Sequence, residues 1–249
     1  MILAINTSTT QFSIAILEDD GAILAEEIIF SGSKSFYSFM PALKELFSYS
    51  RVETAQLNAV AVSIGPGSFT GLRVGLSAAK GMCRALGIPI VGVSSLEAMA
   101  VQVPFSGYPV CPLISSRKGE LFAALFKWSA TQNRMMRITE DKCFRLKELG
   151  SLIHGETVFI GNDFEGQAEA IMNLYDQNAL LAPSFMWTLK ASAVGELGIR
   201  EALERGYDNL DELVPAYLRA PDIRPNPFPP LAGRGVREAG NRESKEIDK

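Results

Sequence analysis

The sequence is short of histidine and cysteine, and both shortages exclude kinds of site. Among its 249 residues there is one histidine, His154, and three scattered cysteines, Cys83, Cys111 and Cys143. A single histidine rules out the HExxH zinc motif and other histidine-rich metal sites. The cysteines form no CxxC pair, which argues against a zinc site and against a disulfide framework, and fits a reducing compartment.

Long apolar runs and an excess of basic residues are also missing. No apolar stretch is long enough to cross a bilayer, and the opening "MILAINTSTTQFSIAILEDD" has no basic region of the kind that begins a signal peptide. The formal net charge is −4 and the pI is about 5.2, so the chain as a whole does not attract nucleic acid or anionic membranes. We therefore expect a cytoplasmic protein that binds no membrane.

What the sequence does contain is a repeated order of strands and turns. The stretches "ILAI", "QFSIAILED" and "AILAEEIIF" predict an antiparallel meander of three strands. The order strand, polar turn, strand returns at "CPLI", "SSRKG" and "ELFAALFKWS", which puts Ser115 where Asn6 stood. Two such copies predict an α/β protein with a duplicated actin-like or sugar-kinase-like (ASKHA) fold, in which each lobe has a mixed sheet flanked by helices.

We place the first lobe at residues 1–100 and the second at residues 101–219. The amphipathic stretch "TLKASAVGELGIREALERG" predicts the last helix of the second lobe, which is free to pack back on the first lobe. Residues 220–249 are rich in proline, glycine and charge and have few aliphatic side chains, so they predict a disordered tail.

The strongest local signal is "GPGSFTGLR", residues 65–73, between the apolar strand "LNAVAVSI" and a helical pattern. Phosphates are often held at such a turn, because the backbone and the helix N-terminus offer N–H donors. The spacing GxGxxxG is nevertheless one residue longer than the dinucleotide fingerprint, and no Lys-Ser or Lys-Thr pair follows. Pro66 removes a donor, and Ser68 or Thr70 is placed to cap the helix. A phosphate cradle is therefore only weakly indicated.

The helix that follows this loop carries two stripes at helical spacing. The first is apolar and predicts burial in the core of its own lobe: Leu72, Leu76, Ala79, Cys83 and Leu86. The second is mostly small and would let another helix approach closely: Gly71, Gly75, Ala78 and Met82. Since Gly75 and Gly81 cost helix stability, they suggest a packing or functional reason. Spacing alone leaves open whether that helix belongs to a partner or to the same chain.

An ATP-dependent kinase of the actin-like fold would need an aspartate in the first turn of each half, because Mg²⁺ prefers anionic oxygen ligands. Asn6 and Ser115 occupy those turns. We therefore assign no catalytic, cofactor-binding or metal-binding residue. A small-molecule kinase and, more weakly, a glycoprotease-like peptidase remain the alternatives to a non-catalytic protein.

Several stretches together resemble the TsaB family, also called YeaZ: "ILAINTST", "GPGSFTGLRVGLSAAKGMCRALGIPIVGVSSLEAMA", "SSRKGELFAAL" and "VPAYLR". The resemblance runs from Met1 to Arg219. It implies a two-lobed actin-like subunit without catalytic activity of its own, which binds and activates the TsaD paralogue. TsaD carries the metal and transfers a threonylcarbamoyl group to adenosine 37 of tRNAs that read ANN codons.

The resemblance also implies the partners and the surface that binds them. TsaE, an ATPase, joins the pair, the chain alone forms a homodimer, tRNA is contacted only through the complex, and ATP or ADP would be held only at the interface with partners. The family uses helices of the first lobe, which places these residues at the partner interface: Phe36, Phe39, Met40, Leu43, Thr70, Gly71, Arg73, Gly75, Ala78 and Met82. Family members often have aspartate where this chain has Asn6 and Ser115, so the resemblance implies little nucleotide binding by this chain.

Overall fold

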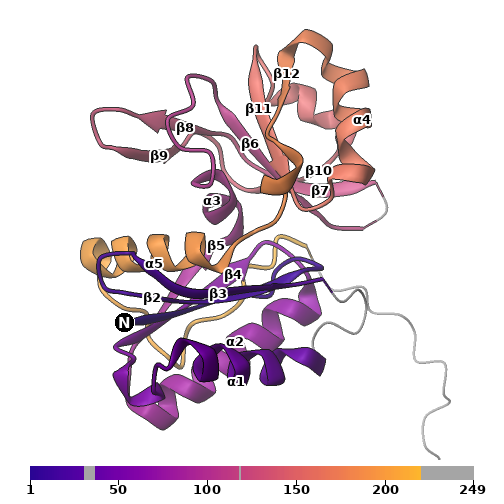
Figure 1. Ribbon diagram of the computed structural model, residues 1–249. Helices are drawn as coiled ribbons and strands as arrows, with labels where there is room; N and C mark the ends of the chain where they lie inside the picture. Colours follow the sequence, from indigo (N-terminus) through magenta and orange to yellow (C-terminus); the bar gives the residue numbers. More distant parts are fainter. Residues whose placement is uncertain (31–36, 118, 220–249) are drawn as a thin grey trace, which may run out of the picture.

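The computed structural model describes residues 1–30, 37–117 and 119–219 of the chain, which form two lobes (Figure 1). The first lobe contains a five-stranded sheet in the order β3-β2-β1-β4-β5. The first three strands are antiparallel, and β4 and β5 run parallel to β1. The strands are β1 (Ile2–Asn6), β2 (Phe12–Leu17), β3 (Ile23–Ile29), β4 (Ala59–Gly65) and β5 (Ile90–Ser94).

Helices cover both faces of this sheet (Figure 1). Below it lie α1 (Phe39–Ser50) and α2 (Phe69–Leu86), which close a core of large aliphatic side chains from the sheet. Above it, between the lobes, lies α5 (Ala191–Arg205). The sheet presents small side chains to α5, and a Cβ atom on Gly198 would lie 2.5 Å from the Cβ of Ala61. This close approach seats the last helix directly on the first sheet.

The second sheet repeats the plan of the first. Its main order is β10-β7-β6-β11-β12, again with three antiparallel strands followed by two that run parallel to the central one. These strands are β6 (Val110–Ser115), β7 (Glu120–Ala123), β10 (Lys142–Arg145), β11 (Thr157–Gly161) and β12 (Ala179–Leu181). The hairpin of β8 (Phe126–Ser129) and β9 (Arg134–Arg137) is inserted before β10.

Short helices complete the described part of the chain. In the connection between the lobes lies α3 (Ser95–Ala100), capped by the side chain of Ser94, and α4 (Phe164–Tyr175) packs in the second lobe. The 3₁₀-helices are η2 (Thr54–Gln56), η3 (Leu146–Ser151), η4 (Asp176–Asn178) and η5 (Ser184–Met186).

The predicted α/β fold with two actin-like lobes is confirmed, and one detail of the second meander was wrong. The stretch "ELFAALFKWS" is not one strand: it breaks between β7 and β8, where the N–H of Leu125 donates to Thr139 Oγ1 at 2.8 Å. The third strand of the meander is therefore β10. The apolar pattern continues through the break, so the sequence did not reveal it. The predicted tail lies outside the described residues, and the proposed lobe limits stay a prediction.

Candidate functional site

The turn after β1 is held by a fully buried asparagine. Asn6 Oδ1 accepts hydrogen bonds from Ser8 N at 3.0 Å, from Ser8 Oγ at 2.7 Å and from Ser63 Oγ at 3.1 Å. Its Nδ2 donates to Leu189 O at 3.1 Å and to Ser13 Oγ at 3.4 Å. The amide thus joins β1 to β2, β4 and the segment before α5. Both ends of the side chain are used inside the fold, so Asn6 has no atom left over for a phosphate or a metal.

The glycine loop packs onto this same turn. A Cβ atom on Gly67 would lie 2.2 Å from Ser8 O, and that carbonyl accepts a hydrogen bond from Ser68 N at 2.7 Å. Ser68 caps α2 through its side chain, which accepts from Gly71 N, as one of the two predicted caps. The glycine is therefore required for a backbone contact within the chain, and the loop's conformation is explained without a ligand.

In the first turns of α2, two glycines of the small-residue stripe contact Thr7, which follows Asn6 in the turn after β1. Thr7 Oγ1 donates to Gly71 O at 2.8 Å, and a Cβ atom on Gly75 would lie only 2.1 Å from Thr7 Oγ1. Both glycines are buried. Gly71 and Gly75 therefore pack against Thr7 of their own chain, which belongs to a turn and not to a second helix.

The corresponding turn of the second lobe follows β6, the central strand of its sheet. Ser115 ends β6 as Asn6 ends β1, as the sequence predicted. Its N–H donates to Asn162 Oδ1 at 2.8 Å, and its Oγ accepts from Gln167 Nε2 at 3.0 Å. Asn162 O in turn accepts from Gln11 Nε2 of the first lobe at 3.2 Å. Asn162 and Gln167 were missed by the sequence analysis, because isolated amides in turns carry no motif.

Between the two turns lies a cavity of about 500 Å³. Its lining is rich in hydroxyl groups and contains the two cations Arg117 and Arg219. The described residues that line it include neither aspartate nor glutamate: Ser8, Thr9, Thr10, Gly67, Ser68, Phe69, Ser115, Ser116, Arg117, Phe122, Asn162, Ala216, Tyr217, Leu218 and Arg219. The cavity can donate hydrogen bonds to an anion, but this lining offers no carboxylate ligand for Mg²⁺.

Residues 206–219 are called here the C-terminal strap, and its last four residues, 216–219, form one wall of that cavity. Tyr217 packs on Phe69 at the start of α2, with 4.9 Å between ring centroids. The guanidinium of Arg73 lies 3.9 Å from the Phe69 centroid and donates to Tyr217 Oη at 3.0 Å. Arg73, predicted for the partner interface, is therefore engaged with its own chain. Only the resemblance in "VPAYLR" had pointed to this segment.

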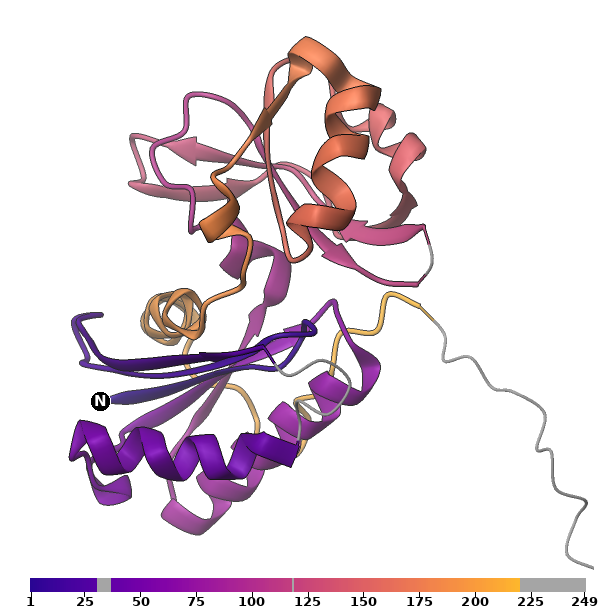
Figure 2. The same ribbon diagram turned by 45° about the vertical axis from the view of Figure 1, so that its right-hand side comes forward.

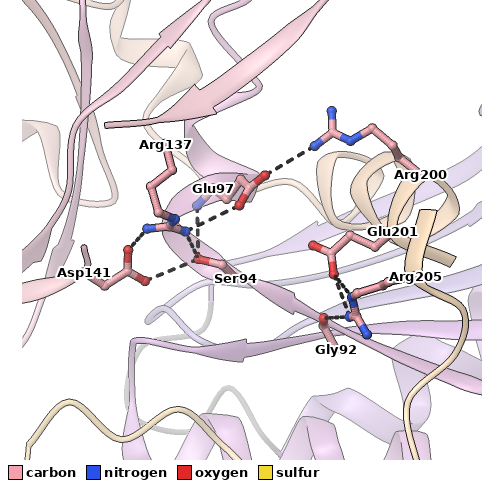
Figure 3. Close-up of polar contacts among 8 residues, drawn as sticks. All are labelled: Gly92, Ser94, Glu97, Arg137, Asp141, Arg200, Glu201 and Arg205. Carbon is pink, nitrogen blue, oxygen red and sulfur yellow. Dashed lines mark hydrogen bonds and ion pairs between the residues drawn. The ribbon is translucent and has the colours of Figure 1, made fainter. Parts of the chain in front are cut away.

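A second polar cluster joins the lobes beside α3 and α5 (Figure 3). Glu97 on α3 accepts from Arg137 Nη2 of β9 at 3.4 Å and from Arg200 Nη2 of α5 at 3.3 Å. Arg137 also donates to Ser94 Oγ at 3.1 Å and pairs with Asp141. Glu97 thus links the inserted hairpin of the second lobe to the helix that rests on the first sheet.

Next to this cluster, Arg205 at the end of α5 anchors the beginning of the strap. It donates to Glu201 at 2.6 Å, to Asp208 at 2.7 Å and to Gly92 O at 3.1 Å. Burial raises the pKa of Glu201, against the hydrogen bonds and charge of Arg205. At Asp208, burial is outweighed by hydrogen bonds from Arg205 and Gly92 N–H, so its pKa lies below the usual value. These acidic groups have structural partners.

The partner interface expected on α1 and α2 stays a prediction, and its residues lie at different depths in the structure. Phe39 and Leu43 point into the core, and Ala78 and Met82 pack partly against it. Thr70 is exposed and Met40 is 61% exposed, while Phe36 lies outside the described residues. In the free chain, Phe39 and Leu43 hold α1 to the sheet.

The described residues contain no group of three or more histidine, cysteine, aspartate or glutamate side chains placed to hold a metal ion. His154 is exposed in the turn before β11. None of the described helices is both long and apolar enough to cross a membrane.

Comparison with known proteins points in one direction. The family model described as "TsaD: tRNA N6-adenosine threonylcarbamoyltransferase" matches residues 33–217. The tRNA threonylcarbamoyladenosine biosynthesis protein TsaB of Bacillus subtilis is 27% identical over 221 residues, which cover 88% of this chain and 93% of that protein. TsaB of Escherichia coli is 28% identical over 172 residues, covering 66% of this chain and 72% of its own length.

The structure of YeaZ from Pseudomonas aeruginosa superposes with a TM-score of 0.73 at 21% sequence identity, covering 87% of this chain and 99% of that one. At this identity the likeness shows that the fold is shared. The TsaD family model matches well over half of the chain, and the relatives that match along the chain are called TsaB. The chain therefore belongs to the TsaD family and, within it, to the TsaB (YeaZ) group.

Proposed function

We propose that this chain works in the biosynthesis of threonylcarbamoyladenosine on tRNA, as a non-catalytic subunit that binds and activates the TsaD paralogue. The observation that carries the proposal is the likeness to Bacillus subtilis TsaB, which extends over 88% of this chain and 93% of that protein. The chemistry of the cleft supports the non-catalytic part. Both ends of the Asn6 side chain form hydrogen bonds within the chain, and the described cavity lining has no carboxylate for Mg²⁺.

The proposed partners are TsaD, the TsaE ATPase once the pair has formed, and a second copy of this chain when TsaD is absent. tRNA is reached only through the complex, in the cytoplasm, which agrees with a net charge of −4. We propose no resident cofactor, and ATP or ADP only at the interface with partners. This division of labour leaves the transfer chemistry to TsaD.

Reconstitution of tRNA modification tests the proposal. Purified TsaD and TsaE, threonylcarbamoyl donor and an ANN-decoding tRNA are incubated with and without this chain, and the modified nucleoside is quantified after digestion of the tRNA. We expect modification to depend on the chain and TsaD to elute with it from a sizing column. Full modification without the chain would contradict the proposal. Binding of Mg-ATP to the isolated chain in calorimetry would favour the kinase alternative.

The partner surface is tested by two matched substitutions. Met40, on α1 inside the proposed surface, is 61% exposed, and Leu203, on α5 outside it, is 83% exposed. Since both side chains are largely in water, Met40→Lys and Leu203→Lys should each leave the fold intact. We expect only Met40→Lys to weaken co-elution with TsaD, because a lysine would have to be desolvated at the interface. Equal behaviour of the two variants would refute this placement of the surface.

Gly81 gives a second, independent probe on α2. It is exposed, and a Cβ atom there would meet no other atom within 4 Å. A substitution such as Gly81→Gln therefore fits the free chain and favours the helix. If a partner helix packs closely on this face, the added side chain should reduce complex formation while the thermal stability of the free chain rises.

A further inference from the structure

The C-terminal strap, residues 206–219, crosses the first lobe from one end of its sheet to the other. It begins at the edge strand β5, where Asp208 N donates to Ile90 O at 2.9 Å. The strap then passes α2, where the Asp211 side chain forms an ion pair with Arg84. The backbone carbonyl of Asp211 accepts a hydrogen bond from Lys80 Nζ at 3.4 Å. Backbone hydrogen bonding thus satisfies part of an otherwise open sheet edge.

At the far end of the first sheet the strap reaches the mouth of the cavity. Ala216 N donates to Ile64 O at 2.7 Å, and Tyr217 packs on Phe69. Two residues later Arg219 forms an ion pair with Glu120 of β7, which belongs to the second lobe. The strap is therefore anchored on the first lobe along its length and ends in a contact with the other lobe.

Elsewhere the lobes are tied on the opposite side of the molecule. There the inserted β8–β9 hairpin faces α5 (Figures 1 and 2), with Arg134 Nη1 donating to both oxygens of Glu204 at 2.7 and 2.9 Å. The Glu97 cluster lies on this same side (Figure 3). At the cavity mouth, the described polar contacts between the lobes include Gln11 with Asn162 at 3.2 Å and Arg219 with Glu120.

We propose that the strap is a clamp on the mouth of the cleft: anchored on the first lobe and paired through Arg219 with Glu120, it holds the two lobes closed over the cavity. When that pair is broken, the lobes separate at the mouth while the Glu97 side of the molecule acts as the hinge. The turns at 66–69 and 115–117, which face each other across the cavity, then become more accessible to water.

Hydrogen–deuterium exchange on the full chain tests the clamp. Arg219→Gln and Glu120→Gln each remove the pair without adding a charge of the wrong sign. Because the pair is partly exposed, we expect exchange of the amides at 67–69 and 115–117 to accelerate by about two- to fivefold. Arg84→Gln is the matched control, since it breaks another ion pair of the strap whose two ends both lie on the first lobe.

The double variant Arg219→Glu with Glu120→Arg exchanges the two charges and should return exchange toward the rate of the unmodified chain. Tyr217→Ala, which removes the aromatic anchor, should accelerate exchange at the same two turns. The proposal is overturned if both glutamine variants exchange at the original rate. It is also overturned if Arg84→Gln accelerates exchange as much as they do, or if the charge exchange restores nothing, because the effect would then not come from the contact between the lobes.

Discussion

Replacing Asn6 by aspartate, the residue that often stands at this position in the family, should destabilise this chain in a pH-dependent way. One oxygen of the introduced carboxyl would keep the three hydrogen bonds that Asn6 Oδ1 now accepts from Ser8 and Ser63. The other oxygen would replace Nδ2, which donates to Leu189 O at 3.1 Å. Two oxygen acceptors would then face each other in a fully buried site, unless the carboxyl keeps its proton and donates it.

The size of the effect follows from the pKa of that carboxyl. Burial and the Leu189 carbonyl favour the protonated form and oppose the donors on the other oxygen, so we take the pKa to rise from about 4 in the unfolded chain to about 6 in the folded one. Below pH 4 the group is protonated in both states and Asn6→Asp should be close in stability to the original. Between pH 4 and pH 6 the unfolded chain releases this proton while the folded chain keeps it, so the penalty grows over this range and levels off above pH 6 at about 2.7 kcal/mol.

Urea unfolding followed by circular dichroism between pH 4 and pH 7.5 measures this penalty as the difference in free energy of unfolding between variant and original. Ser115→Asp is the control, because Ser115 ends the equivalent strand but is only half-buried, so its carboxyl reaches water. We expect the control to show a smaller change with pH. A difference for Asn6→Asp that stays constant from pH 4 to pH 7.5 would refute the inference that Nδ2 must be a donor.

Two further predictions concern the fold around α2 and the cysteines. Gly75→Ala should lower the free energy of unfolding by about 1–3 kcal/mol, because the new methyl group would lie 2.1 Å from Thr7 Oγ1. Gly81→Ala, in open space on the same helix, should raise the free energy of unfolding by about 1 kcal/mol. Equal effects of the two variants in thermal unfolding would contradict the assigned packing. Burial raises the pKa of the Cys83 thiol to about 11 and that of the Cys111 thiol to about 12. Both thiols should therefore react slowly with a thiol reagent at pH 8 until the chain is unfolded. Rapid labelling of Cys111 in the native chain would show that its strand is open to solvent.

The parts of the fold that repeat a simple period could be predicted from the sequence. Four members of the predicted stripe, Leu72, Leu76, Ala79 and Cys83, are buried as its spacing required, and the fifth, Leu86, at the end of the helix, is partly buried. Ser68 caps the helix that it precedes. The equivalence of Asn6 and Ser115 followed from the repeated order of strand and turn. In each case the signal lies within about one or two turns of chain, where local geometry determines which side chains share a face.

The parts that depend on distant contacts could not be predicted. The break before β8 is fixed by a hydrogen bond from Leu125 N–H to Thr139 Oγ1. Position 75 is a glycine because Thr7, far away along the chain, leaves no room there for a Cβ atom. The second wall of the cavity comes from Tyr217, which reaches Phe69 only after the chain has passed through the other lobe and returned. Sequence spacing carries no information on such pairs. The spacing therefore left open whether the small-residue stripe of α2 contacts a partner protein or the same chain, and it did not indicate the contact with Thr7.

The hydrogen bonds of Asn6 distinguish it from an aspartate that holds a metal ion. A catalytic aspartate must leave a charged oxygen free for a metal or its waters. An amide can accept at one end and donate at the other, and Asn6 does both within the fold, joining β1 to Ser63 on β4 and to Leu189 on the segment that leads back from the second lobe. The amide therefore ties the first sheet to the segment that leads into α5. A turn fixed in this way loses little conformational freedom on binding, and this agrees with the proposed role of the chain as a binding subunit.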